Sequence, residues 1–111
     1  GASWLEKLRR YIRQNMEEAV GMINADVKGV RAWLPEGTYL IWADASELIR
    51  RAGLTDDREL ARLLEDEGRV KFTPGSAFGN GGGGFLRINT ACPRSQLMEG
   101  LERLKLWAQE R

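Results

Sequence analysis

Apolar side chains recur every three or four positions over residues 4–23, with charged residues between them. This spacing predicts a long amphipathic helix with one apolar stripe. Ser3 is placed to cap its first turn, because Glu6 follows three residues later in the spacing of a capping box. Gly21 falls near the expected end, so the pattern leaves open whether Met22 and Ile23 are helical.

Residues 29–34 alternate instead, which predicts a strand with Val30, Ala32 and Leu34 on one side and Arg31 and Trp33 on the other. A turn at residues 35–37 follows, in which Gly37 supplies a positive φ. Residues 38–44 form a second strand, and we expect the two strands to pair as a hairpin.

The remaining pattern alternates helices, strands and glycine-rich turns. We expect a short helix over 45–52 that ends at Gly53. A longer helix over 55–67 is capped by Thr55 or Asp56 and ends at Gly68. After these we expect a strand at 69–72 ended by Thr73, Pro74 and Gly75, a glycine-rich loop at 76–84, a strand at 85–90, and a last helix capped by Ser95.

The order α-β-β-α-α-β-β-α predicts an α+β fold of one domain, residues 1–111. We expect a two-layer sandwich, with helices packed on one face of a mostly antiparallel sheet of three to four strands. The second strand is apolar on both sides, with Tyr39, Ile41 and Ala43 facing one way and Leu40 and Trp42 the other. Either the loop and the first helix cover the second face, or another domain or subunit does.

The last strand places Leu86 and Ile88 toward the helices and Phe85, Arg87 and Asn89 on the opposite face. A guanidinium held on a rigid strand suits a carboxylate, because its planar fork donates two parallel hydrogen bonds. The alternative is a surface arginine paired with a nearby Asp or Glu.

Composition removes several classes of chemistry. The 111 residues include no histidine, which excludes Ser-His-Asp and Cys-His catalysis and a Cys/His zinc site within this chain. A net charge of +1 gives no reason to expect nucleic acid or a membrane as a partner. Cys92 is the single cysteine, which favours a reducing, cytoplasmic setting. We expect no transmembrane span and no signal peptide, and the sequence leaves open whether Gly1–Ser3 is a tag remnant.

Three segments resemble motifs of one family. Residues 35–44 are similar to the P-x-G/A-T-Y-L-x-W-x-D hairpin of pyridoxal-phosphate (PLP) dependent C–S lyases of the MalY/PatB type. Residues 70–79 resemble their V-x-x-x-P-G-x-x-F-G segment, and residues 84–95 their G-F-x-R-[LI]-N-x-A-C-P-R-S segment. The three motifs occur in the family's order over nearly the whole chain. The broader group is the class I/II aminotransferases, fold type I among PLP enzymes.

The resemblance implies that the chain is the C-terminal small domain of a larger enzyme, with residues 1–23 as the tail of an interdomain helix. Arg87 would bind the substrate α-carboxylate, with Asn89 as a further candidate, and Gly75, Ser76 and Phe78 would lie in an active-site loop. The resemblance further implies a PLP-binding large domain of the same polypeptide, a homodimer, and an amino-acid substrate.

The same resemblance places the cofactor lysine and the phosphate-binding groups in the large domain. None of Lys7, Lys28, Lys71 and Lys105 matches the cofactor lysine's motif, so we expect this chain alone to bind no cofactor and to be inactive. Cystathionine β-lyase activity is the first expectation and an aminotransferase the second. A free-standing ligand-binding or self-associating module stays open as a third.

Other candidate groups have plainer interpretations. Residues 79–84 lack the G-K-[ST] ending of a phosphate-binding loop and precede a strand, so we expect a flexible connection. No catalytic or metal site is expected among Asp44, Glu47, Asp56, Asp57, Glu65 and Asp66, which we assign to helix caps and solvated faces. Cys92 belongs to the local fold, and Trp4, Trp33, Trp42 and Trp107 are expected to be packing residues.

Overall fold

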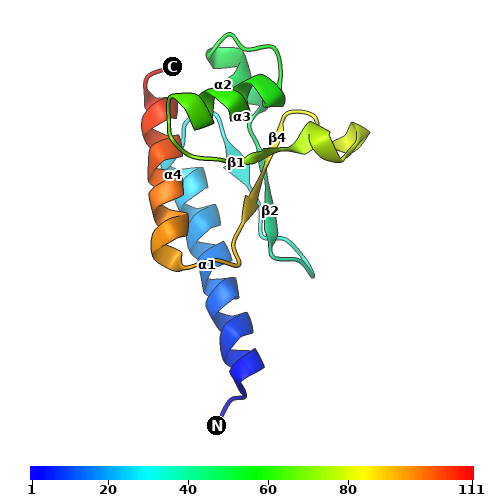
Figure 1. Ribbon diagram of the computed structural model, residues 1–111, viewed down its shortest axis with the longest axis vertical. Helices are drawn as coiled ribbons and strands as arrows, with labels where there is room; N and C mark the ends of the chain where they lie inside the picture. The colour runs from blue at the N-terminus through cyan, green and yellow to red at the C-terminus, as the bar shows by residue number, and fades with distance from the viewer.

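The computed structural model describes residues 1–111, with the side chain of Asn80 excepted. Helices and strands alternate in the predicted α+β pattern (Figure 1). The elements are α1 (Trp4–Asp26), β1 (Arg31–Ala32), β2 (Leu40–Asp44), α2 (Ser46–Arg51), α3 (Asp57–Asp66), β3 (Thr73–Pro74), the 3₁₀ turns η1 (Gly75–Phe78) and η2 (Asn80–Gly82), β4 (Phe85–Asn89) and α4 (Arg94–Gln109).

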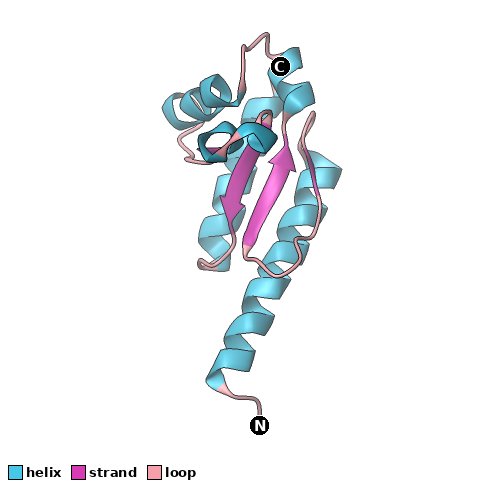
Figure 2. Cartoon of the chain, turned by 90° about the vertical axis from the view of Figure 1, so that its right-hand side faces the viewer, coloured by secondary structure: helices cyan, strands magenta, loops and turns pink.

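The strands form one antiparallel sheet in the order β1-β2-β4-β3 within the described residues. The long helices α1 and α4 lie side by side along one face of this sheet, and α2 and α3 lie near one end (Figures 1 and 2). The predicted α+β sandwich with helices on one face is therefore confirmed. The N-terminal part of α1 projects beyond the sheet, where Trp4 is 76% exposed.

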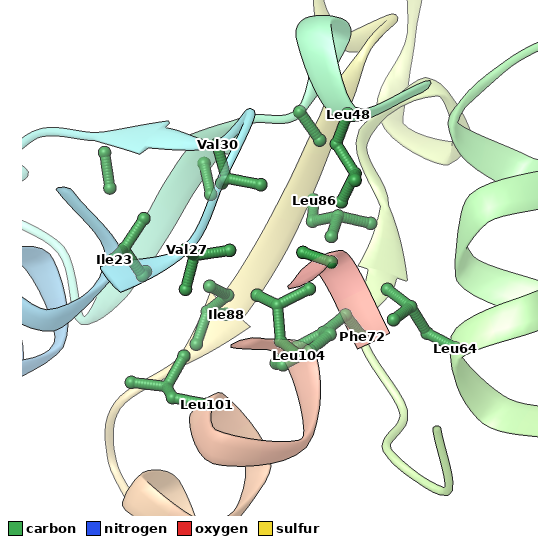
Figure 3. Packing of buried hydrophobic residues seen from close by; sticks show 14 of the residues in the cluster. Ile23, Val27, Val30, Leu48, Leu64, Phe72, Leu86, Ile88, Leu101 and Leu104 are labelled. Atoms are coloured by element: carbon green, nitrogen blue, oxygen red, sulfur yellow. The ribbon is translucent and has the colours of Figure 1, made fainter. Parts of the chain in front are cut away.

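The core fills the space between the helices and the sheet (Figure 3). Leu86 and Ile88 of β4 point into it from the sheet, and Leu101 and Leu104 meet them from α4. All four are at most 1% exposed. Full burial of such a side chain contributes about 1.5–3 kcal/mol, so this layer is the main source of stability.

The first helix is capped as expected, because Ser3 Oγ accepts a hydrogen bond from the Glu6 N–H at 3.1 Å. It continues through Gly21 and ends at Asp26, so Met22 and Ile23 are helical. The hairpin is also present, with Ala32 paired to Ala43, and Gly37 has the positive φ expected in its turn.

The first strand is shorter than predicted, since only Arg31 and Ala32 pair with β2. A side chain completes the outer edge of this strand. Asn24 Nδ2 donates to the Ala32 carbonyl at 2.9 Å, and the Ala32 N–H donates to Asn24 Oδ1 at 2.9 Å. Residues beyond Ala32 leave the ladder, so Leu34 is 45% exposed, although Val30 and Ala32, predicted on the same side, are buried.

The strand predicted at 69–72 is wrong, and the strand lies at Thr73–Pro74, where a turn was expected. The end of α3 explains the shift. The Val70 N–H still donates to the Leu64 carbonyl, and Arg69 takes a positive φ of 56°. Residues 69 and 70 therefore complete the helix terminus and cannot join the sheet.

Two further expectations are corrected. Helix α4 begins at Arg94 and not after Ser95, because Pro93 supplies the first carbonyl and the fixed φ of an N-cap. The free N–H of Arg94 donates to Tyr11 Oη of α1 at 2.7 Å, so a neighbouring helix does the capping. Trp107 is buried as predicted, but Trp4 and Trp33 are mostly exposed.

None of the helices in the described part of the chain is long and apolar enough to cross a membrane.

Candidate functional site

The candidate site lies on the face of the sheet opposite α1 and α4, which is turned to the viewer in Figure 2. Arg87 is in the middle of β4, with Trp42 of β2 and Thr73 of β3 as its direct cross-strand neighbours. Its sequence neighbours Leu86 and Ile88 are buried in the core. Because alternate residues of a strand face opposite sides, Arg87 projects from the face predicted for it.

Aromatic rings enclose the guanidinium of Arg87. Its Cζ lies 3.7 Å from the centroid of the Phe78 ring and 5.6 Å from that of the Trp42 ring. Trp42 in turn meets Phe78 and Phe85 edge to face, at centroid distances of 6.3 and 6.1 Å. Stacking on aromatic faces stabilises a guanidinium and leaves its N–H groups directed outward in the plane.

No carboxylate of the described residues lies within ion-pair distance of Arg87, although six other ion pairs form in the same part of the chain. Its Nε is buried and has no hydrogen-bond partner among the described atoms, and the Ser76 hydroxyl is in the same condition. Buried polar atoms without partners are uncommon and costly. The alternative of a surface arginine neutralised by a local acid does not hold for Arg87.

The glycine-rich segment covers part of this face. Gly75 lies so close to Trp42 that an added Cβ would be 2.9 Å from the indole ring and 2.9 Å from Phe85 Cβ, and it would also meet the Gly82 carbonyl oxygen. Only glycine fits at this contact. Residues 75–78 and 80–82 form the two turns η1 and η2, and of the predicted loop residues Phe78 lies beside Arg87, while Gly75 packs against Trp42 and the Ser76 N–H bonds to Asp57.

Asn89 shares the face of Arg87, two residues further along β4. Its Oδ1 accepts a hydrogen bond from the Ala91 N–H at 2.8 Å, which forms the turn that leaves the strand. Its oxygen is therefore engaged locally, and its Nδ2 is the group that remains to donate to a ligand.

The sequence pattern did not identify two residues that contribute to this site. Trp42 was assigned to packing, yet it stands opposite Arg87 in register and is 37% exposed. Asp57 was assigned to helix caps and solvated faces, yet it is buried and accepts a hydrogen bond from the Ser76 N–H at 2.7 Å. The register of the hairpin could have indicated Trp42, whereas a contact across 19 residues leaves no local signal.

Cys92 lies next to this site, because it lines one pocket with Arg87 and Asn89 and its thiol donates to the Asn89 carbonyl at 3.6 Å. Cys92 is half-buried, and burial raises the pKa of its thiol above the ordinary value. Within the described residues, no group of three or more Cys, Asp or Glu side chains is arranged to hold a metal ion.

Several known proteins are similar to this chain in sequence and in fold. No protein-family model matches the sequence. The chain is 38% identical over 105 residues to the cystathionine beta-lyase PatB of Bacillus subtilis, and 36% identical over 101 residues to the protein MalY of Escherichia coli. These alignments cover 95% and 91% of this chain but 26% and 25% of the relatives, so the chain spans about a quarter of their length.

A solved structure has the same fold as this chain. A PLP-bound protein of Clostridium difficile 630, assigned as an aminotransferase, superposes with a TM-score of 0.83 at 45% identity. The match covers 95% of this chain and 26% of that one. Other relatives and structures with this likeness are cystathionine beta-lyases, C–S lyases and aminotransferases. The chain is therefore homologous, over nearly its whole length, to about a quarter of the length of cystathionine beta-lyases of the PatB and MalY kind and of PLP-bound aminotransferases.

Proposed function

We propose that the chain is the small domain of a PLP-dependent enzyme acting on amino acids, and that Arg87 binds the α-carboxylate of the substrate. The observation that carries this proposal is the unneutralised guanidinium on the open face of the sheet. Each hydrogen bond from a charged group contributes about 1.5–3 kcal/mol where water is excluded. A bidentate carboxylate would supply both the counter-charge and the acceptors that Arg87 lacks.

The aromatic rings around Arg87 favour a ligand whose contacting group is planar. Phe78 and Trp42 occupy the space around the guanidinium, so an anion reaches it along its edge, in the plane of the N–H groups. Asn89 Nδ2 on the same face is a second donor for the same carboxylate or for an adjacent polar group. Arg87 in this role orients the amino acid and does not take part in bond breaking.

The chain's own groups do not fit a complete cofactor site. Its fully buried polar and charged residues among those described are Asn15, Asp57 and Thr90, with no lysine between them. PLP supplies carbanion stabilisation when it is bound, and the lysine for it would come from the large domain. We therefore propose that residues 1–111 alone are inactive and that a PLP-binding large domain of the same polypeptide, in a homodimer, completes the site.

The exposed apolar residues support the need for further protein. Trp33, Leu34 and Tyr39 on the hairpin are 58%, 45% and 44% exposed, and Trp4 stands on the projecting end of α1. In this proposal residues 1–23 continue an interdomain helix, and the open sheet face meets the large domain and the bound substrate. Exposed apolar patches of this kind usually mark an interface.

The reaction we propose is C–S β-elimination, as in a cystathionine β-lyase, with transamination as the second candidate. Relatives with both kinds of name match this chain, so the domain alone does not separate them. Pyruvate release from cystathionine by the complete protein, measured beside keto-acid exchange in a transamination assay, distinguishes the two reactions. Release of pyruvate without transamination supports the lyase, and the reverse result supports the aminotransferase.

Substitution of Arg87 tests the binding role. In the complete protein, Arg87→Ala is expected to raise KM for amino-acid substrates and to lower kcat/KM at least about tenfold, the equivalent of one lost charged hydrogen bond. Arg50→Ala, which removes an exposed arginine paired only with Glu47 on α2, is the matched control and is expected to change little. Unchanged kinetics in Arg87→Ala would show that another group binds the carboxylate.

A self-associating module is the alternative that the exposed hairpin residues also favour. Sedimentation of the 111-residue chain separates the two. A concentration-independent monomer weakens this alternative, whereas a stable dimer that lacks any affinity for amino acids supports it.

A further inference from the structure

A buried carboxylate stands behind the aromatic enclosure of Arg87. Asp57 lies in the first turn of α3 and is 2% exposed. Its Oδ2 accepts a hydrogen bond from the Ser76 N–H at 2.7 Å, across 19 residues of sequence. Helix α3 also packs against β3 and η1, so this bond joins the helix to the segment that covers the site.

The bond holds a turn that has few other means of support. Pro74, which precedes η1, provides no side-chain cap for it, and Pro itself has no N–H to donate. Gly75 is wedged against Trp42 and Gly82, which fixes where the turn begins. The Ser76 N–H is the next donor along the chain, and Asp57 is its acceptor.

The far end of the same turn is Phe78, whose ring covers Arg87 at 3.7 Å. Phe78 is 54% exposed, so burial alone does little to keep it in place. Its position over the guanidinium depends on the direction in which the backbone of η1 leaves Ser76.

We propose that Asp57 is a positioning residue that keeps the Phe78 ring stacked on Arg87 by fixing the Ser76 backbone. A helix-dipole role does not account for its burial, because Asp56 already caps α3 through the Glu59 N–H at 2.9 Å. An acid that served only the dipole would remain in solvent, as Asp56 does. The consequence for substrates rests on the proposed function: with Phe78 in place, a carboxylate meets Arg87 edge-on.

Proton NMR of the 111-residue chain tests the positioning directly. A guanidinium group beneath an aromatic ring has upfield-shifted side-chain protons, and Phe78→Leu measures how much of that shift in Arg87 comes from Phe78. In Asp57→Ala we expect the Phe78-dependent shift of Arg87 to be lost and the Ser76 amide to exchange at least about tenfold faster. Asp57→Asn keeps an oxygen acceptor in place and is expected to restore both signals.

Two further variants keep the test decisive. Asp56→Ala removes the helix cap without touching Ser76, so it is expected to lower stability while the Arg87 shift persists. Asp57→Ser suits a first helical turn but is too short to reach Ser76, and it replaces Asp57→Ala where that variant does not fold. An unchanged Arg87 shift in a folded Asp57→Ala or Asp57→Ser chain, or an equal loss in Asp56→Ala, overturns the proposal.

The complete protein separates this inference from the proposed function. With both correct, Asp57→Ser raises KM for amino acids severalfold at nearly constant kcat, and Asp56→Ala does not. Loss of the NMR signature without any change in KM would retain the positioning role and count against carboxylate binding at Arg87.

Discussion

Asn15 accepts a hydrogen bond from Nε of Arg94 at 2.9 Å, which joins two residues 79 positions apart. The Asn15 amide also donates to the carbonyls of Thr90 and Cys92, at 3.1 and 2.9 Å. This fully buried side chain thus ties the middle of α1 to the connection between β4 and α4. That connection begins three residues after Arg87, so its attachment also fixes the end of the strand that carries the site.

Asn15→Ala is expected to lower the free energy of unfolding by about 2–3 kcal/mol, because the buried Thr90 carbonyl and the part-buried Cys92 carbonyl lose a donor, and Arg94 Nε keeps only its contact with Glu18. Urea unfolding followed by circular dichroism measures the loss. Gln14→Ala removes only an exposed bond to Arg94 and is expected to cost less than about 0.5 kcal/mol. Equal effects of the two variants would contradict the central role of Asn15.

Two glycine-to-alanine substitutions are expected to have opposite signs. Gly21 lies inside α1 with open space around it, so Gly21→Ala should stabilise the chain by about 0.5–1 kcal/mol through helix propensity. Gly75→Ala brings a methyl group against Trp42, Phe85 and Gly82 and should destabilise it by about 1–3 kcal/mol. Thermal unfolding of both variants checks the signs, and a neutral Gly75→Ala would show that the turn adjusts freely.

Alanine substitutions at two nearby leucines of α4 should differ sharply in their effect on stability. Leu104 is fully buried between the helices and the sheet, and Leu106 is 52% exposed. Leu104→Ala is expected to cost about 2–5 kcal/mol because it leaves a cavity, and Leu106→Ala to stay within about 0.5 kcal/mol. Chemical denaturation of the two variants gives the comparison, and similar losses would indicate that Leu106 is covered in solution.

The thiol of Cys92 should react slowly near neutral pH. Burial disfavours the thiolate, so the pKa of Cys92 is raised in the folded chain. The folded state therefore binds the thiol proton more tightly than the unfolded state, and this group lowers stability as pH rises above the ordinary thiol value. The pH profile of reaction with a thiol reagent should lie at higher pH in the folded chain than in urea, and coincident profiles would refute the shift.

The spacing of apolar residues was sufficient to predict the elements whose side chains enter the core. From Ile12 onward the stripe of α1 meets the core as predicted, whereas its first members are exposed. The alternation of β4 predicted which of its faces meets the core and placed Arg87 on the opposite side. The three motifs supplied the family, which the relatives confirm. The binding role of Arg87 is still a prediction.

The errors arose at helix ends and where a distant contact decides the local structure. The helix-terminal bond from Val70 to Leu64 moved β3 by several residues, and Tyr11 on α1 made a side-chain cap at Ser95 unnecessary. Asn15 gave a usable signal, because it is a polar residue on the apolar stripe between Ile12 and Met16. Asp57 gave none, since an acid in a first helical turn is ordinary until its distant partner is known.

The amide of Asn24 has a consequence for assembly. An edge strand normally presents free N–H and C=O groups on which a strand of a second molecule can pair. At Ala32 both groups already bond to one side chain, so the outer margin of β1 offers no template there. A strand of a second molecule therefore cannot pair with Ala32, and this part of the edge does not support an intermolecular, fibre-like sheet.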